Sequence, residues 1–114
     1  MDINVKFGSG LGEDFDAQRS KEIIVTRTLH SLDCFASTLR NVTVNLRDLN
    51  GEKGGVDIEC TVAGSFHDGT QFHVRAVTST FENSLSQALQ KAFRVVSKKK
   101  KHPIKKASLS EAFA

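Results

Sequence analysis

Three segments of alternating apolar and polar residues, separated only by short turns, constrain the fold more than any other feature of the chain. They span residues 42–47, 56–62 and 72–76, and each carries apolar residues at every second position. This period is typical of a strand with one buried face. Asp68-Gly69 between the last two segments is a strong hairpin signal, and a parallel crossover would need about a dozen residues or more. We therefore predict an antiparallel meander of three strands.

The first part of the chain predicts one further strand and one helix. Residues 3–7 alternate in the same way, with Ile3, Val5 and Phe7 on one face. A long segment without Gly or Pro follows, in which apolar residues recur every three or four positions. We predict a helix over residues 13–37, opened by acidic residues that suit a helix N-terminus.

The last predicted helix is the most regular element. Ser79 and Glu82 have the spacing of a capping box, and the apolar residues that follow keep helical spacing. Pro103 cannot continue a helix, because it lacks the backbone N–H and its ring clashes with the preceding turn. We therefore predict a helix over residues 79–101.

These elements predict an α+β fold in the order β-α-β-β-β-α. Its economical packing is two layers: a four-stranded sheet with two helices on one face. The 114 residues suffice for one domain, predicted over residues 1–102, with a flexible C-terminal tail over 103–114. The open face of the sheet would carry Lys6, Asn45, Arg47, Asp57, Glu59, His73 and Arg75.

Positive charge is concentrated near the end of the chain. Residues 1–82 hold eight basic and twelve acidic residues, whereas residues 83–110 hold eight basic residues and no acid. On a helical wheel, one stripe of basic residues faces away from the apolar side. Its members are Lys91, Arg94, Lys98 and Lys101. A solvated helix face usually carries both acidic and basic residues, so this stripe indicates binding to a polyanion such as nucleic acid. The alternative is a charged face that only keeps the protein in solution.

The nucleic-acid-binding residues that we expect lie mostly in this helix and just after it. Lysines contact phosphates as point charges and do not read sequence. The expected residues are Lys91, Arg94, Lys98, Lys99, Lys100, Lys101 and Lys105, together with Arg75 on the last strand and Arg27 on the first helix.

The chain resembles the ribosome hibernation-promoting factor and ribosome-associated inhibitor Y family, also called the sigma-54 modulation protein family, in its short form. Residues 30–35 followed by 39–46 resemble the end of the family's first helix and the V-x-V-x-L strand after it. Residues 72–76 resemble its fourth strand. The spacing of Leu85, Ala88, Lys91 and Ala92 and of the lysines after Ser97 is similar to that of its last helix.

This resemblance implies a ribosome-associated translation inhibitor, a hibernation factor of stress and stationary phase. It would bind rRNA of the small ribosomal subunit near the decoding centre and block the tRNA and mRNA sites, as a monomer off the ribosome. The alternatives are a non-ribosomal protein-interaction module and a double-stranded RNA-binding-like domain. The latter carries its lysine cluster at the start of the last helix, whereas here the lysines lie toward its end.

Other functional classes find little support in the sequence. The four histidines form no metal-ligand motif, and we expect no enzymatic activity, cofactor, metal or small-molecule substrate. No apolar run approaches the length of a membrane span, and we expect no membrane partner. Cys34 and Cys60 lie far apart, outside any CxxC pair, which favours two buried thiols in a reducing compartment and a cytoplasmic protein.

Overall fold

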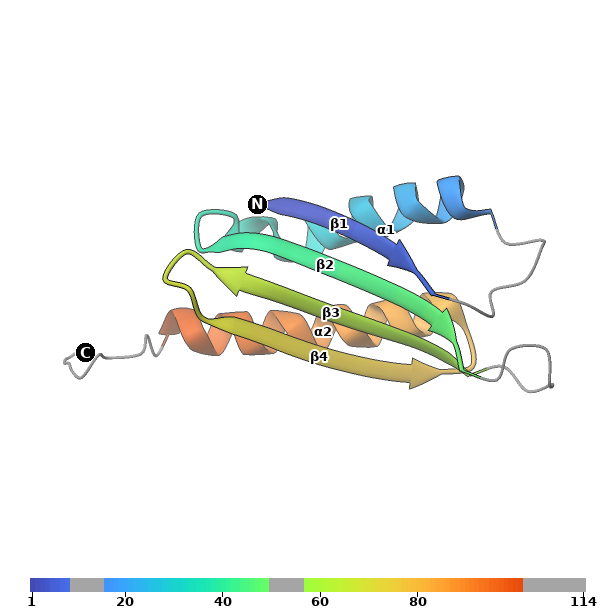
Figure 1. Ribbon diagram of the computed structural model, residues 1–114. Helices are drawn as coiled ribbons and strands as arrows, with labels where there is room; N and C mark the ends of the chain where they lie inside the picture. Colours follow the sequence, from blue (N-terminus) through green and yellow to red (C-terminus); the bar gives the residue numbers. More distant parts are fainter. Residues whose placement is uncertain (9–15, 50–56, 102–114) are drawn as a thin grey trace.

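The computed structural model describes residues 1–8, 16–49 and 57–101. For residues 100 and 101 it describes only the backbone. The described residues form a four-stranded sheet with two helices on one face (Figure 1). The predicted α+β class and element order are confirmed. The elements are β1 (Asp2–Phe7), α1 (Ala17–Leu32), a 3₁₀ turn (Asp33–Phe35), β2 (Leu39–Asp48), β3 (Ile58–Phe66), β4 (Gln71–Thr78) and α2 (Phe81–Lys101).

The strands lie in chain order, β1-β2-β3-β4. β1 runs parallel to β2, with α1 as the crossover, and the other two pairings are antiparallel as predicted. Val44 pairs with Val5 on one side and Val62 on the other, so their side chains share the face that the helices cover. Figure 1 shows α1 behind β1 and β2, and α2 behind β3 and β4.

The core lies between the sheet and the helices. β2 and β3 alternate between buried and less buried residues, which matches the period seen in the sequence. Burying one such aliphatic side chain stabilises the fold by about 1.5–3 kcal/mol. The core residues are Ile24, Leu32, Phe35, Leu39, Val42, Val44, Leu46, Ile58, Cys60, Val62, Phe66, Phe72, Ala76, Leu85, Ala88, Leu89, Ala92 and Val96.

Helix α1 is shorter than the predicted 13–37, of which residues 13–15 lie outside the described part of the chain. Asp16 is the N-cap: its side chain accepts a hydrogen bond of 3.0 Å from the backbone N–H of Arg19. At the other end the chain tightens into the 3₁₀ turn, which brings Phe35 into the core at 5% exposure. Cys34 on this turn is exposed, so the prediction of two buried thiols is correct for Cys60 alone.

The N-terminal cap of helix α2 lies one residue later than predicted. Thr80, not Ser79, accepts the hydrogen bond from the backbone N–H of Asn83, at 3.2 Å. Buried Ser84 then ties this end of the helix to the sheet. Its hydroxyl donates to the carbonyl of Ile58 at 2.6 Å and accepts from the backbone N–H of Thr78 at 3.2 Å. These contacts fix how α2 lies across β3 and β4.

The predicted hairpin between β3 and β4 is confirmed. Gly69 adopts a φ of 93°, which a residue with a side chain rarely adopts. Asp68 accepts hydrogen bonds from both the backbone N–H and the hydroxyl of Thr70, at 2.9 and 2.7 Å. The predicted turn between β2 and β3 and the tail over 103–114 lie outside the described residues.

Candidate nucleic-acid interface

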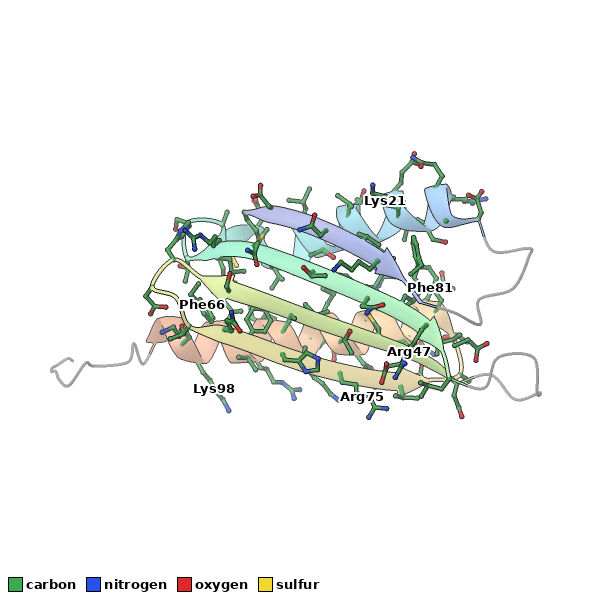
Figure 2. The ribbon with its side chains drawn as sticks, viewed as in Figure 1. Lys21, Arg47, Phe66, Arg75, Phe81 and Lys98 are labelled. Atoms are coloured by element: carbon green, nitrogen blue, oxygen red, sulfur yellow. The ribbon has the colours of Figure 1, made fainter. Side chains whose placement is uncertain are left out.

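The outer face of α2 carries three exposed cations, Lys91, Arg94 and Lys98, which we call the basic stripe. The helix places them there because they recur three and four residues apart, opposite the buried Ala92 and Val96. Figure 2 shows Lys98 pointing away from the body of the protein. Successive members are about 4.5–6 Å apart along the helix axis, a spacing that lets neighbouring cations contact successive phosphates.

The basic stripe keeps its charge. In the described part of the chain, the ion pairs involve Arg47, Arg75 and Lys99, and none of the three stripe residues. Lys91 does make a hydrogen bond, since its ammonium donates to the backbone carbonyl of Arg75 at 2.7 Å. A carbonyl is neutral, so this bond orients the lysine without cancelling its charge.

Lys99, which we predicted to bind nucleic acid, lies outside the basic stripe and has a carboxylate partner. Its ammonium lies 2.7 Å from the carboxylate of Asp68 and 5.2 Å from the centre of the Phe66 ring. Its side chain is only 15% exposed. The Lys99 ammonium and the hydrogen bonds from Thr70 hold the pKa of Asp68 well below its usual range. Lys99 therefore fastens the end of α2 to the β3–β4 hairpin.

Arg75 lies on β4, on the open face of the sheet, and its charge is partly compensated. Its guanidinium and that of Arg47 each bind one carboxylate oxygen of Glu59, the Arg47 pair at 2.7 Å. Glu59 was expected on a solvated face but is buried between the two arginines. Burial alone would raise the pKa of Glu59, and the hydrogen bonds from Arg75 and Arg47 more than offset this, so the pKa is lowered.

Arg27 and Arg94, which are distant in sequence, line the same groove between α1 and α2. The Arg27 guanidinium donates a hydrogen bond of 2.6 Å to the hydroxyl of Ser86 across this groove. Phe93 is one of the helix-spaced apolar residues of α2, yet it lies at the edge of the helix's apolar side and is 42% exposed. The helix groove encloses about 440 Å³ and is lined by Arg27, Ser31, Ser86, Leu89, Gln90, Phe93 and Arg94.

A second hollow, on the open face of the sheet, differs from the helix groove in its chemistry. It holds about 460 Å³ and has neither lysine nor arginine among its lining residues. The helix layer therefore offers the stronger attraction for a polyanion. Residues lining this second hollow are Asn41, Thr43, Ala63, Gly64, Ser65, Gln71, Phe72 and His73.

The structure brings together only part of the predicted site. Lys91, Arg94 and Lys98 share one surface, Arg27 adjoins it through the helix groove, and Arg75 touches it through Lys91. The side chains of Lys100 and Lys101, and all of Lys105, lie outside the described residues. Sequence reasoning missed the exposed ring of Phe93 and the groove beside it. The only signal of this groove in the sequence is that Phe93 lies at the edge of the apolar side of the helix.

Over residues 1–8, 16–49 and 57–101, no three or more His, Cys, Asp or Glu side chains gather as metal ligands would. Neither α1 nor α2 combines the length and the apolar character that crossing a lipid bilayer requires.

Comparison with known proteins finds solved structures that are similar to this one. No protein-family model matches the chain, and no curated protein gives a significant match to it. A ribosomal subunit interface protein from Coxiella burnetii superposes with a TM-score of 0.69 at 12% identity, over 89% of this chain and 99% of that one. The Protein Y N-terminal domain of Thermus thermophilus gives a TM-score of 0.63 at 20% identity, over 86% of this chain and 98% of that one. This chain therefore has the fold of these two proteins, as the resemblance in its sequence predicted.

Proposed function

We propose that this protein is a ribosome-associated factor that binds rRNA of the small subunit through α2. The observation that carries the proposal is the basic stripe: Lys91, Arg94 and Lys98 are exposed and have no carboxylate partner within the described residues. Uncompensated cations in a row repel one another, and a phosphate backbone relieves that repulsion. One protein of the same fold is a ribosomal subunit interface protein, which supports the ribosome as the source of that backbone.

The proposed mechanism is steric occlusion, not catalysis. The basic stripe and Arg27 hold phosphates, while the two-layer body fills space near the decoding centre that tRNA and mRNA would otherwise occupy. Binding of this kind would inhibit translation and keep idle ribosomes in a hibernating state under stress. In this proposal the protein acts as a monomer in the cytoplasm.

The test is co-sedimentation with ribosomes after reversing the charge of the stripe. We expect the variant Lys91→Glu, Arg94→Glu, Lys98→Glu to stay in the supernatant, because carboxylates in place of these cations repel rRNA. The matched control is Lys6→Glu, Arg19→Glu, Lys21→Glu, which changes the net charge equally at exposed positions outside α2. The control should pellet with ribosomes.

Two results would count against the proposal. Equal loss of binding in both triple variants would indicate attraction by net charge alone. Unchanged pelleting of the stripe variant would exclude α2 as the contact surface and favour a protein-interaction module, whose binding would also be insensitive to salt.

A further inference from the structure

The helix groove contains a feature that a phosphate-binding surface does not need, the exposed ring of Phe93. This ring packs against Phe35, with ring centres 5.2 Å apart and planes tilted by 56°. Phe35 is itself 5% exposed, so it anchors Phe93 from the core side. The ring is thus held in place while 42% of the residue stays open to solvent. A fixed, half-open aromatic ring is suited to stacking on another flat ring.

The charges around this ring favour an aromatic ligand that is also an anion. Arg27 and Arg94 line the groove, and the lining residues include no carboxylate. Arg27 is oriented by its hydrogen bond to Ser86, whereas Arg94 belongs to the basic stripe and is exposed. A nucleotide combines a flat ring with an anionic phosphate. A volume of about 440 Å³ can admit one nucleobase.

The groove and the stripe are continuous, because Arg94 belongs to both. On the helix Arg94 follows Lys91 by three residues and precedes Lys98 by four, so a phosphate backbone that tracks the stripe passes the mouth of the groove. A base turned out of that strand would meet Phe93 directly. Ser31 and Gln90 on the groove wall offer hydrogen bonds to the edge of such a base.

We propose that the helix groove binds one unstacked nucleobase of single-stranded RNA, with Phe93 as the stacking platform and Arg94 on the adjoining phosphate. The inference rests on the proposed function and deepens it. The basic stripe supplies backbone contacts that every nucleic acid offers, whereas the groove selects RNA with an unpaired base.

The composition of the chain makes a direct test possible. The protein contains no Trp and no Tyr, so the variant Phe93→Trp carries a single indole fluorophore at the proposed platform. The probe is an oligoadenylate of about eight nucleotides, a length typical of single-strand sites. A backbone of equal length without bases and a blunt RNA duplex are the comparisons. The control is Leu29→Trp, which places the fluorophore on α1 at an equally exposed position outside the groove.

We expect saturable quenching of Phe93→Trp by oligoadenylate, and none by the abasic backbone or the duplex. Leu29→Trp should show no quenching by any probe. A second variant, Phe93→Ala, should bind oligoadenylate about tenfold more weakly, since stacking on an aromatic side chain contributes about that much per base. Its affinity for the abasic backbone should stay unchanged, with binding followed by the anisotropy of labelled probes.

Three results would overturn the nucleobase site: no quenching at concentrations that saturate anisotropy, equal quenching by duplex, or no binding of oligoadenylate at all. Each of them leaves co-sedimentation with ribosomes free to succeed. Conversely, a stripe variant that still pellets with ribosomes refutes the proposed function without affecting the fluorescence result.

Discussion

At the scale of single residues, Glu59 shows how a charged group can be buried on the open face of a sheet. It lies on β3, opposite Arg47 of β2 in the strand register and diagonal to Arg75 of β4. The two guanidiniums cover its carboxylate, whose side chain is 9% exposed, while they remain 53% and 54% exposed themselves. Glu59 thereby lowers the repulsion between two cations on the strands that flank β3.

The variant Glu59→Gln should therefore be less stable than the parent, by about 1 kcal/mol at neutral pH, because a neutral amide cannot compensate two guanidiniums. The pKa of Glu59 is lowered in the folded protein, so its contribution is complete above the ordinary pKa of glutamate, about 4.3. That contribution is lost as the pH falls through the lower, folded pKa. Urea denaturation of both proteins at pH 7 and below pH 4 should show a difference that shrinks in acid.

A control for this measurement is Glu22→Gln, at an exposed position on α1. It should change the free energy of unfolding by less than about 0.5 kcal/mol at either pH. A Glu59→Gln variant that is less stable by the same amount at both pH values would mean that the carboxylate acts by shape and not by charge.

Glu59 and Cys34 mark the limit of what the sequence could predict at this scale. Alternation places Glu59 on the open face correctly, but the arginines that bury it come from other strands, and only the pairing register brings them there. Cys34 was expected to be buried because a cysteine outside any CxxC pair is usually a core thiol. It lies instead on the 3₁₀ turn Asp33–Phe35, where it is exposed while the next residue, Phe35, is buried in the core.

At the scale of elements, two adjacent lysines of α2 have different surroundings. Lys98 and Lys99 are separated by about 100° around the helix. Lys98 points to solvent with the basic stripe, whereas Lys99 turns toward Asp68 and Phe66 of the β3–β4 hairpin. A single helix thus carries the basic stripe on one side and, on another, the contacts that fasten its own last turns.

Replacing each lysine by alanine should separate these two tasks. Lys99→Ala should lower the free energy of unfolding by about 1 kcal/mol through loss of the contact with the Phe66 ring, while ribosome binding changes little. Lys98→Ala should leave the stability unchanged within about 0.5 kcal/mol and weaken ribosome binding. Urea denaturation and quantitative co-sedimentation measure the two effects. The reverse pattern, with Lys98 important for stability, would contradict the assignment.

The sequence predicted α2 better than any other element, because helix-spaced apolar residues are informative over five turns. Its cap was misplaced by one residue: Ser79 and Thr80 can both cap a helix, and the structure uses Thr80. The helical wheel separated Lys98 from Lys99, but it could not show what Lys99 contacts. The residue that distinguishes Lys99 is Asp68, which lies 31 positions earlier in the chain and is brought close by the β3–β4 hairpin.

At the scale of the whole molecule, the pattern of alternation predicted the layers and the meander correctly. The short turns fixed the antiparallel pairings, and the helix between the first two strands allowed β1 to run parallel to β2. The helix groove could not be predicted in this way, because it depends on how α1 and α2 lie against each other on the sheet. The fold thus places Arg27 of one helix beside Arg94 and Phe93 of the other.

The same arrangement predicts how binding should depend on salt. Each phosphate that a lysine or arginine neutralises contributes about 0.7–0.9 to the slope of log affinity against log salt. If Lys91, Arg94 and Lys98 all contact rRNA, the triple alanine variant should reduce the magnitude of that slope by about 2–3. Alanine at Lys6, Arg19 and Lys21 should leave the slope as it is, although it removes the same charge. Ribosome binding measured over a range of potassium concentrations at fixed magnesium gives both slopes. Equal reductions would mean that the whole surface attracts rRNA diffusely, and the basic stripe would then have no special role.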